Sequence, residues 1–256
     1  MKSRIQRVQA LVFDVFGTVV DWRGSVIREG RRFGRTHGIA IDWGAFADAW
    51  RARYHPSMQR VRTGEMPWTG LDELHRASLD ALLAQFGIAG LPGIAVDHLN
   101  RVWHRLSPWP DARLGLRLLR RRYTIATLSN GNVALLTAMA KHASLPWDCI
   151  LSAELFRHYK PDPEVYTGAA ALLGLAPEEV MMVAAHRNDL EAARACGLAT
   201  AFVPRPLEFG TGSRQEPRGA RYIDVVADDF VKLAARLGEI APGCREAAIA
   251  GHLRRV

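Results

Sequence analysis

The stretch that decides the fold reads Leu11-Val12-Phe13-Asp14-Val15-Phe16-Gly17-Thr18-Val19-Val20-Asp21. An apolar run typical of a β-strand ends in the carboxylate of Asp14, and Gly17 and Thr18 then supply a tight turn. In an open α/β sheet, ligands bind in the crevice outside the carboxyl ends of the strands. We therefore predict that Asp14 stands at the ligand-binding edge of a sheet, although a polar loop residue would give the same local pattern.

The composition is that of a globular chain, long enough for one α/β domain with an insertion or for two small domains. Of the 256 residues, 48% are hydrophobic, and the formal net charge is +8. This charge suggests nucleic acid as a partner, but the arginines are spread along the whole length. Their densest cluster, residues 120–122, falls at the end of an expected helix, where cations complement the helix dipole. No zinc spacing or RNA-binding aromatic motif accompanies it, so we expect no nucleic-acid partner.

The cysteines and the N-terminus indicate a cytoplasmic protein. The chain has three widely spaced cysteines, Cys149, Cys196 and Cys244. Their odd number fits a reducing compartment, and none has metal-ligand spacing. The N-terminal basic residues imitate a signal peptide, but Asp14 interrupts the apolar run and no small-residue cleavage site follows. No stretch is long enough to span a membrane, so we expect no membrane association.

Residues 23–107 show helical periodicity and no strand pattern. Helices are expected at about 23–36, 43–62, 71–86 and 95–106. About 85 residues therefore separate the first strand from the next, too many for one crossover connection. We interpret 23–107 as an inserted helical cap domain and residues 1–22 and 108–256 as the core domain.

From residue 108 onward, strands alternate with helices. Strands are expected at 123–128, 149–151, 180–184 and 200–203, with helices between them and a last helix at 228–237. This alternation predicts an α/β fold with a doubly wound, parallel, Rossmann-like sheet. Residues 208–220 are rich in Gly, Pro and charge and are interpreted as a surface loop. Residues 243–256 are expected to be either a frayed tail or a contact arm.

Polar groups follow several of these strands, either directly or in the loop beyond. They are Asp14, the pair Ser129 and Asn130, Lys160, and Asp189. Each alone has an ordinary explanation as turn chemistry, a loop charge or an acid at a helix N-terminus. A parallel sheet, however, brings the carboxyl ends of its strands to one edge. Together these groups predict a site beneath the cap.

Four ordered motifs of this chain resemble those of the haloacid dehalogenase superfamily. They are Asp14-Val15-Phe16-Gly17-Thr18, Leu128-Ser129-Asn130-Gly131, Tyr159-Lys160-Pro161-Asp162-Pro163-Glu164-Val165-Tyr166, and Asp189 ahead of a helix. The match covers about residues 11–205, and the Trp50-Arg51 pair is similar to the cap motif of the 2-haloacid dehalogenase branch. The resemblance implies a hydrolase similar to type II (S)-2-haloacid dehalogenases and haloacetate dehalogenases.

Phe16 separates the branches of this superfamily. Phosphatase members carry a second Asp two residues after the nucleophile, because an alkoxide leaving group must be protonated, and they use Mg²⁺ to neutralise phosphoryl charge. Phe16 can neither transfer a proton nor pair with a cation. A halide is a weak base and leaves without a proton, so the site still suits displacement of halide from carbon. The resemblance implies an aromatic residue here, with no metal and no cofactor.

The resemblance also implies two chemical steps. Asp14 attacks the halogen-bearing Cα and displaces the halide, giving an ester on the enzyme by nucleophilic covalent catalysis. Water activated by Asp189 then attacks the ester's carbonyl carbon and releases a 2-hydroxy acid, inverted at Cα. Lys160 keeps Asp14 ionised, because an opposite charge within about 4–6 Å favours the carboxylate. The cap excludes water during the first step.

Binding roles are carried over in the same way. The substrate carboxylate is assigned to Ser129 and to the backbone N–H groups of Val15 and Phe16, the halide to Arg51 and Asn130, and supporting hydrogen bonds to Thr18 and Tyr166. The expected partner is a small haloacid. A homodimer is expected from the resemblance alone.

The fourth motif departs from the best-known pattern. It reads Val183-Ala184-Ala185-His186-Arg187-Asn188-Asp189, where the familiar motif has Ser at Ala184 and Asn at His186. His186 takes over the missing polar role, or it merely caps the next helix. With a donor such as His186, a tighter pocket would favour small haloacetates, including fluoroacetate.

Two other functions stay open at this point. One is a Mg²⁺-dependent phosphate-ester hydrolase of the same superfamily, for which the sequence offers only Asp21 as a replacement acid near Phe16. The other is a catalytically silent basic protein that binds nucleic acid or acidic partners, with strongly salt-dependent retention on DNA. That second function would leave the set Asp14, Ser129, Lys160 and Asp189 unexplained.

Overall fold

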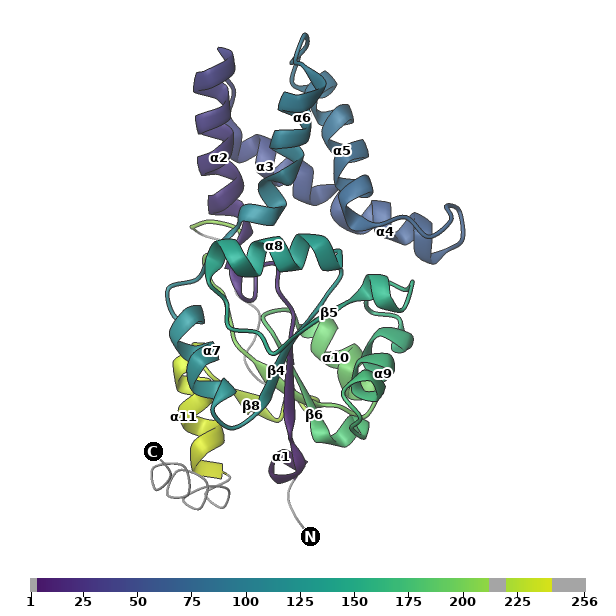
Figure 1. The fold of residues 1–256 in the computed structure, drawn as a ribbon, viewed down its shortest axis with the longest axis vertical. Coiled ribbons are helices and arrows are strands. Elements are labelled where there is room, and N and C mark those ends of the chain that lie inside the picture. The colour runs from purple at the N-terminus through teal and green to yellow at the C-terminus, as the bar shows by residue number, and fades with distance from the viewer. Residues whose placement is uncertain (1–3, 212–219, 241–256) are drawn as a thin grey trace, which may run out of the picture.

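The computed structural model describes residues 4–211 and 220–240 (Figure 1). Within these ranges the core is a six-stranded parallel sheet of order β5-β4-β1-β6-β7-β8. The strands are β1 (Ala10–Phe13), β4 (Thr124–Ser129), β5 (Cys149–Ser152), β6 (Val180–Ala184), β7 (Ala199–Phe202) and β8 (Val225–Val226). From β1 the chain builds outward first through β4 and β5, and then through β6, β7 and β8 on the other side. The strand order therefore reverses between β1 and β6, which is where such sheets bind ligands.

Helices cover both faces of this sheet. The helices α7 (Ala112–Arg120) and α11 (Phe230–Ile240) pack on one face, and α9 (Pro163–Leu172) and α10 (Arg187–Ala195) on the other (Figure 1). A strand covered on both sides needs a continuous apolar run. All four residues of β1 are accordingly buried with no exposed surface. The predicted doubly wound α/β fold is confirmed.

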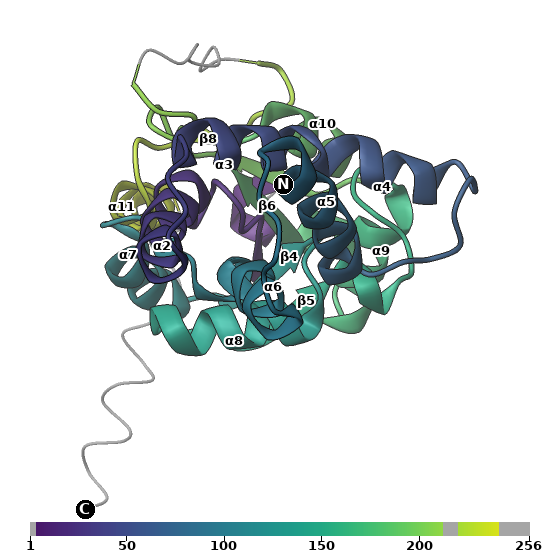
Figure 2. The same cartoon turned by 90° about the horizontal axis from the view of Figure 1, so that it is seen from above.

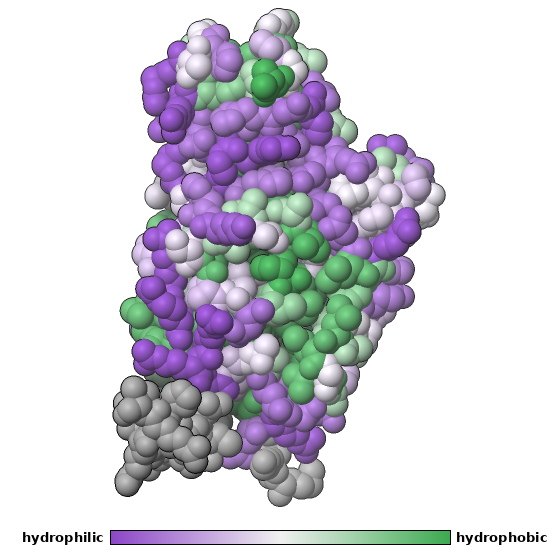
Figure 3. Space-filling view, in the orientation of Figure 1, coloured by the Kyte–Doolittle hydropathy of each residue, from purple (hydrophilic) through white to green (hydrophobic). Residues whose placement is uncertain are grey.

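A helical cap lies beyond the carboxyl ends of the strands (Figure 1). It consists of α2 (Trp22–His37), α3 (Trp43–Ala52), α4 (Tyr54–Arg62), α5 (Leu71–Gln85), α6 (Gly93–Asn100) and the 3₁₀ helix η1 (Arg101–Arg105). Seen from above, α3 and α4 follow one another across the molecule (Figure 2). The cap helices present mainly hydrophilic residues on the face seen in Figure 3. Their apolar sides meet inside the cap, where Phe46 and Trp50 are buried.

Two predicted cap helices differ from the structure. The single helix expected at 43–62 is broken at Arg53 into α3 and α4. Pro56 explains the break, because a proline clashes with the carbonyl four residues earlier, and that residue is Ala52, the last of α3. The helix expected at 95–106 ends at Asn100 and continues as η1.

The two chain segments that connect the cap to the core lie side by side. The chain enters the cap after β2 (Val20–Asp21) and leaves it through β3 (Ser107–Pro108), and these strands pair antiparallel. Asp21 then caps α2, because its side chain accepts a hydrogen bond from the Gly24 N–H at 2.8 Å. The strand pair was not predicted, since two residues are too few to show periodicity. The division at residues 22 and 108 stays a prediction.

A further helix, α8 (Val133–Ala143), packs against β5 and η1. The remaining elements are short, namely α1 (Arg4–Arg7), η2 (Ala153–Leu155) and η3 (Pro177–Glu179). The interpretation of 208–220 as a surface loop is wrong at its first residue, because Glu208 is only 4% exposed. Residues 212–219, the tail 243–256 and Cys244 lie outside the described residues. Within the described ranges, none of the helices is long and apolar enough to cross a membrane.

Candidate active site

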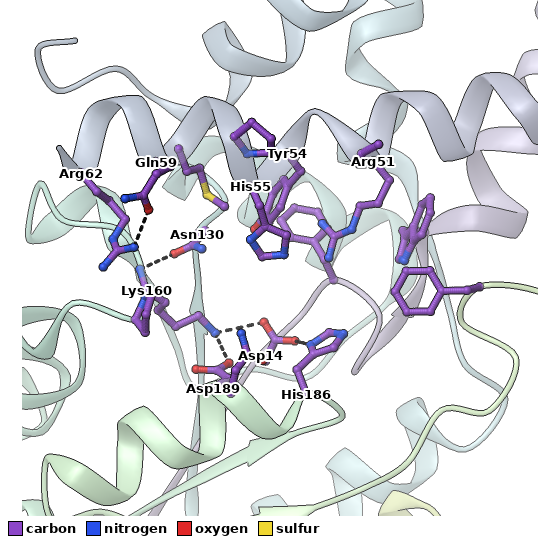
Figure 4. A pocket seen from close by; sticks show the side chains of 18 of the residues that line it. Asp14, Arg51, Tyr54, His55, Gln59, Arg62, Asn130, Lys160, His186 and Asp189 are labelled. Carbon is purple, nitrogen blue, oxygen red and sulfur yellow. Dashed lines mark hydrogen bonds and ion pairs between the residues drawn. The ribbon is translucent and has the colours of Figure 1, made fainter. Parts of the chain in front are cut away.

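Asp14 lies at the point where the strand order reverses. It follows β1, and its N–H donates to the Val183 carbonyl of β6 at 3.0 Å. The residue is 7% exposed, and three groups hold its carboxylate, of which Lys160 and His186 are labelled in Figure 4. Lys160 Nζ donates to Oδ1 at 3.0 Å, the Thr18 hydroxyl donates to Oδ2 at 2.7 Å, and His186 Nδ1 lies 3.1 Å from Oδ2. The carboxylate is therefore fixed in one orientation.

Lys160 joins the two carboxylates that the sequence placed at this edge. Its Nζ contacts Asp14 Oδ1 at 3.0 Å and Asp189 Oδ2 at 2.5 Å. The other oxygen of Asp189 accepts a hydrogen bond from the Tyr166 hydroxyl at 2.6 Å. The backbone N–H of Lys160 donates to Asn130 Oδ1 at 2.8 Å, which ties this loop to the end of β4. The sequence-predicted groups Asp14, Asn130, Lys160 and Asp189 thus meet as expected.

The buried charges shift one another's protonation. Burial alone would raise the pKa of Asp14, but Lys160 and His186 hold it well below its ordinary range. Burial and the negative charge of Asp14 raise the pKa of Asp189 above its usual value, against the effect of Lys160. The pKa of Lys160 is raised by both carboxylates despite its burial. Asp14 is therefore an ionised carboxylate beside a weaker acid.

Glu208 is the site residue that the sequence interpretation missed. Its carboxylate oxygens lie 3.0 and 3.1 Å from His186 Nε2, and one of them accepts the Trp22 Nε1–H at 3.1 Å. Gly17 leaves room for it: with φ at +84°, a Cβ there would lie 2.1 Å from Glu208 Oε1. No local sequence pattern predicts this contact. Glu208 lies in a polar segment after the last predicted strand, 200–203, where no strand end or helix marks it as a site residue.

The cavity between cap and core has a volume of about 850 Å³. Its wall includes eight of the predicted site residues, namely Asp14, Phe16, Arg51, Asn130, Lys160, Tyr166, His186 and Asp189. Ser129, Thr18 and Val15 are buried and are not part of this wall. The Ser129 hydroxyl accepts the Gly131 N–H at 3.3 Å. The α4 residues His55, Gln59 and Arg62 close the cavity from the cap side (Figure 4).

Arg51 reaches the cavity from α3. Its guanidinium carbon lies 4.1 Å from the centre of the Tyr54 ring and 5.4 Å from that of Trp22. Nη1 is buried without a hydrogen-bond partner. A buried donor left unpaired is costly, and a guanidinium satisfies an anion well. Arg51 is therefore a candidate for binding an anion in the cavity.

Phe16 forms the apolar part of the wall. Its ring packs edge-on against Tyr54, His75 and Trp103, with ring centres 6.3, 6.5 and 5.9 Å apart. The alternative acid Asp21 does not line the cavity, since it caps α2 and pairs with Arg28 at 3.5 Å. Within the described ranges, no group of three or more His, Cys, Asp or Glu side chains is arranged to hold a metal ion.

Comparison with known proteins shows the family. Residues 8–197 match the family model described as haloacid dehalogenase-like hydrolase. The chain belongs to the haloacid dehalogenase-like hydrolases. Among these hydrolases, the (S)-2-haloacid dehalogenase 4A of Burkholderia cepacia is 32% identical over 208 residues, covering 78% of this chain and 85% of the relative. The superfamily resemblance seen in the sequence is confirmed.

Solved structures of haloacid dehalogenase-like hydrolases agree with this assignment. One L-2-haloacid dehalogenase is 49% identical with a TM-score of 0.85, and covers 90% of this chain and 99% of its own. A defluorinating L-2-haloacid dehalogenase is 45% identical with a TM-score of 0.88, and covers 93% and 98%. Core and cap together are thus shared with these enzymes.

Proposed function

We propose that this protein converts short 2-haloalkanoic acids to 2-hydroxy acids and halide through an ester on Asp14. The enzyme class, a hydrolase acting on carbon–halide bonds, follows from the family and its named relatives. The observation that carries the finer proposal is the pair formed by Asp14 and Arg51 in the wall of one cavity. One is an ionised carboxylate, and the other is a partly buried cation whose Nη1 is buried and lacks a hydrogen-bond partner.

The first step is an in-line displacement at Cα. Asp14 attacks and the halide leaves toward Arg51, whose unpaired donor stabilises the departing negative charge. Asn130 also lines this cavity and is the second group assigned to the halide. Lys160 keeps Asp14 charged, and the cap limits the water that reaches the carboxylate.

The second step is hydrolysis of the ester. Asp189 takes a proton from water as the water attacks Cγ of Asp14. Its raised pKa suits a general base better than that of an ordinary carboxylate, because a base works best when its pKa approaches the operating pH. Tyr166 and Lys160 fix its two oxygens. Only the first step breaks a bond to Cα, so the configuration there inverts once.

Phe16 argues against the phosphate-ester alternative. An alkoxide leaving group needs an acid two residues after Asp14, and a buried aromatic ring occupies that position. Asp21, the replacement acid that the sequence offers near Phe16, is engaged at the start of α2. Fluoroacetate belongs in the proposed substrate range, because a 45% identical relative carries the description defluorinating.

Halide release tests this proposal directly. We expect purified protein in EDTA to release halide from chloroacetate, from one enantiomer of 2-chloropropionate and from fluoroacetate. Asp14→Asn should lower the rate by more than about 10³-fold, because the nucleophile is lost. Hydrolysis in ¹⁸O-water should place the label in Asp14 during a single turnover. Absence of halide release, together with Mg²⁺-dependent hydrolysis of phosphate esters, would refute the proposal.

A further inference from the structure

The two oxygens of Asp14 have different surroundings. Oδ1 contacts Lys160 at 3.0 Å, and Figure 4 shows this oxygen on the side of the open cavity below His55. Oδ2 is turned away from it and is held by the Thr18 hydroxyl at 2.7 Å and by His186 Nδ1 at 3.1 Å. Oδ1 is thus the oxygen free to attack a substrate. Oδ2 then becomes the carbonyl oxygen of the ester.

Both groups on Oδ2 are necessarily donors. An ionised carboxylate can only accept, so the Thr18 hydroxyl donates its single proton to Oδ2, while its oxygen accepts the Ala185 N–H at 2.9 Å. His186 lies between two carboxylates, with Nδ1 at Asp14 and Nε2 at Glu208. Ionised carboxylates only accept, so the ring must carry a proton on each nitrogen to satisfy both. The geometry therefore describes an imidazolium.

The surrounding residues hold the Glu208 side chain beside His186. It is 4% exposed, it accepts the Trp22 indole N–H, and Gly17 leaves the space that it occupies. Among the described residues, the charged or titratable groups that face His186 are Asp14 after β1, Glu208 after β7 and His55 on α4 of the cap. Lys160 and Asp189 lie on the other side of Asp14. Burial alone would lower the pKa of His186, but the hydrogen bonds to Asp14 and Glu208 raise it to about 10.

We propose that His186, held as an imidazolium by Glu208, and Thr18 form the oxyanion site for hydrolysis of the Asp14 ester. This inference rests on the proposed function. His186 is then a catalytic residue, because it touches the reacting oxygen, and Glu208 is a positioning residue that acts through it.

Hydrolysis of the ester passes through a tetrahedral intermediate at Cγ of Asp14. Water adds to Cγ and gives a proton to Asp189, while the C=O electron pair moves to Oδ2, where Thr18 and His186 stabilise it. When this pair returns, the Cγ–Oδ1 bond breaks and Oδ1 leaves as the oxygen of the 2-hydroxy acid. It takes a proton from Lys160, which is restored by Asp189. Asp14 is left as a carboxylic acid carrying the water oxygen, and its proton goes to solvent.

Glu208 matters most once the ester has formed. Alkylation removes the negative charge of Asp14, so of the two carboxylates that contact His186 only Glu208 remains ionised. Without that charge the ring would lose a proton near neutral pH and would no longer be certain to present an N–H to Oδ2. The ester would still form, and its hydrolysis would slow.

Glu208→Gln separates the two steps, because it removes the charge and keeps the size. We expect a burst of one halide per active site within about threefold of the wild-type rate, followed by turnover slower by roughly 10- to 100-fold; complete loss of an oxyanion donor costs about 10²–10³-fold. Mass spectrometry should show the ester accumulating on Asp14. Lowering the pH should restore hydrolysis relative to wild type, because the ring is then protonated without Glu208. Glu178→Gln, at an exposed position, is the matched control.

Three results would contradict the inference that His186 and Thr18 form the oxyanion site. Wild-type protein that releases no halide would overturn the proposed function and this inference with it. Active wild type with a Glu208→Gln variant slowed equally in both steps at every pH would mark Glu208 as merely structural and overturn the inference alone. If Glu208→Gln does not fold, His186→Gln gives the second test: the halide burst should persist and ester hydrolysis should slow, and an equal loss of both steps contradicts the proposal.

Discussion

At the scale of single residues, the proposed mechanism assigns attack and leaving-ion stabilisation to two different parts of the molecule. Asp14 belongs to a buried loop of the core, whereas Arg51 comes from a cap helix. The guanidinium lies over the Tyr54 ring, and its Nη1 has no hydrogen-bond partner. Lysine would preserve the charge at this position but neither the stacking nor the planar array of donors.

We therefore expect Arg51→Lys to lower kcat/KM for chloroacetate by roughly 10²-fold, a loss of about 2.7 kcal/mol in transition-state stabilisation. Bromide is the better leaving group and depends less on assistance, so the loss with bromoacetate should be smaller. Initial rates with both substrates give the comparison. Arg53→Lys, whose side chain bonds Gln85 within the cap, should leave both rates unchanged. Equal losses for the two halides would rule out a role in leaving-group stabilisation.

The residues that sequence could predict share one property. Asp14, Asn130, Lys160 and Asp189 follow strands, directly or in the next loop, so the rule for strand ends locates them without any knowledge of packing. Glu208 could not be found this way. Its contact with His186 spans 22 residues and depends on how the segment after β7 folds back over Gly17. A contact that depends on tertiary folding in this way cannot be predicted from the local sequence.

At the scale of elements, hydrophobic runs located β1, β4, β6 and β7 because buried parallel strands are apolar throughout. The strands β2, β3 and β8 were not predicted, because each of the three has only two residues. Pro56 was the one visible sign that α3 and α4 are separate helices. That break places α4, with His55, Gln59 and Arg62, against the cavity.

The helix α4 is fastened to the core through Arg62. Its guanidinium donates to Asp162 Oδ1 at 2.7 and 2.8 Å, and Asp162 lies two residues after Lys160. We expect Arg62→Gln to raise KM by roughly three- to tenfold, because the cap closes less firmly over the substrate. The change in unfolding free energy should stay below about 1 kcal/mol, since the pair is partly exposed.

The matched control is Arg60→Gln on the same helix. Arg60 pairs with Glu65, so that pair lies within the cap and joins nothing to the core. Steady-state kinetics and urea unfolding of the two variants side by side make the test. If Arg60→Gln raises KM as much as Arg62→Gln does, a general disturbance of α4 is responsible and the role of the cap–core ion pair is wrong.

At the scale of the whole molecule, the buried charges of the candidate site also affect the stability of the fold. The pKa of His186 is raised from 6.5 to about 10 in the native state. Between these values the native protein binds more protons than the unfolded chain, so this group's stabilisation is complete below the lower value and is lost as pH rises through the upper one. The charge network that prepares the site thus also favours the folded state near neutral pH.

The unfolding free energy of wild type should therefore fall between about pH 7 and pH 10 more steeply than that of His186→Gln. Urea denaturation at several pH values measures both slopes. The two proteins should differ most at the acidic end of this range and least at the alkaline end. His142→Gln, at an exposed histidine of α8, should keep the wild-type slope. Parallel curves for wild type and His186→Gln would show that His186 is not charged in the native state.

The pairing of β2 with β3 has a consequence for how such an enzyme can be rebuilt. Asp21 and Ser107 are register partners in that pair, and antiparallel partners lie only about 4.5–5.5 Å apart. The whole excursion through the cap therefore starts and finishes at almost the same point. The cap segment therefore connects two neighbouring points of the core, as the loop of a β-hairpin does. We therefore expect that a different lid can be joined between these two residues, and the substrate range changed, without moving the carboxylate that follows β1.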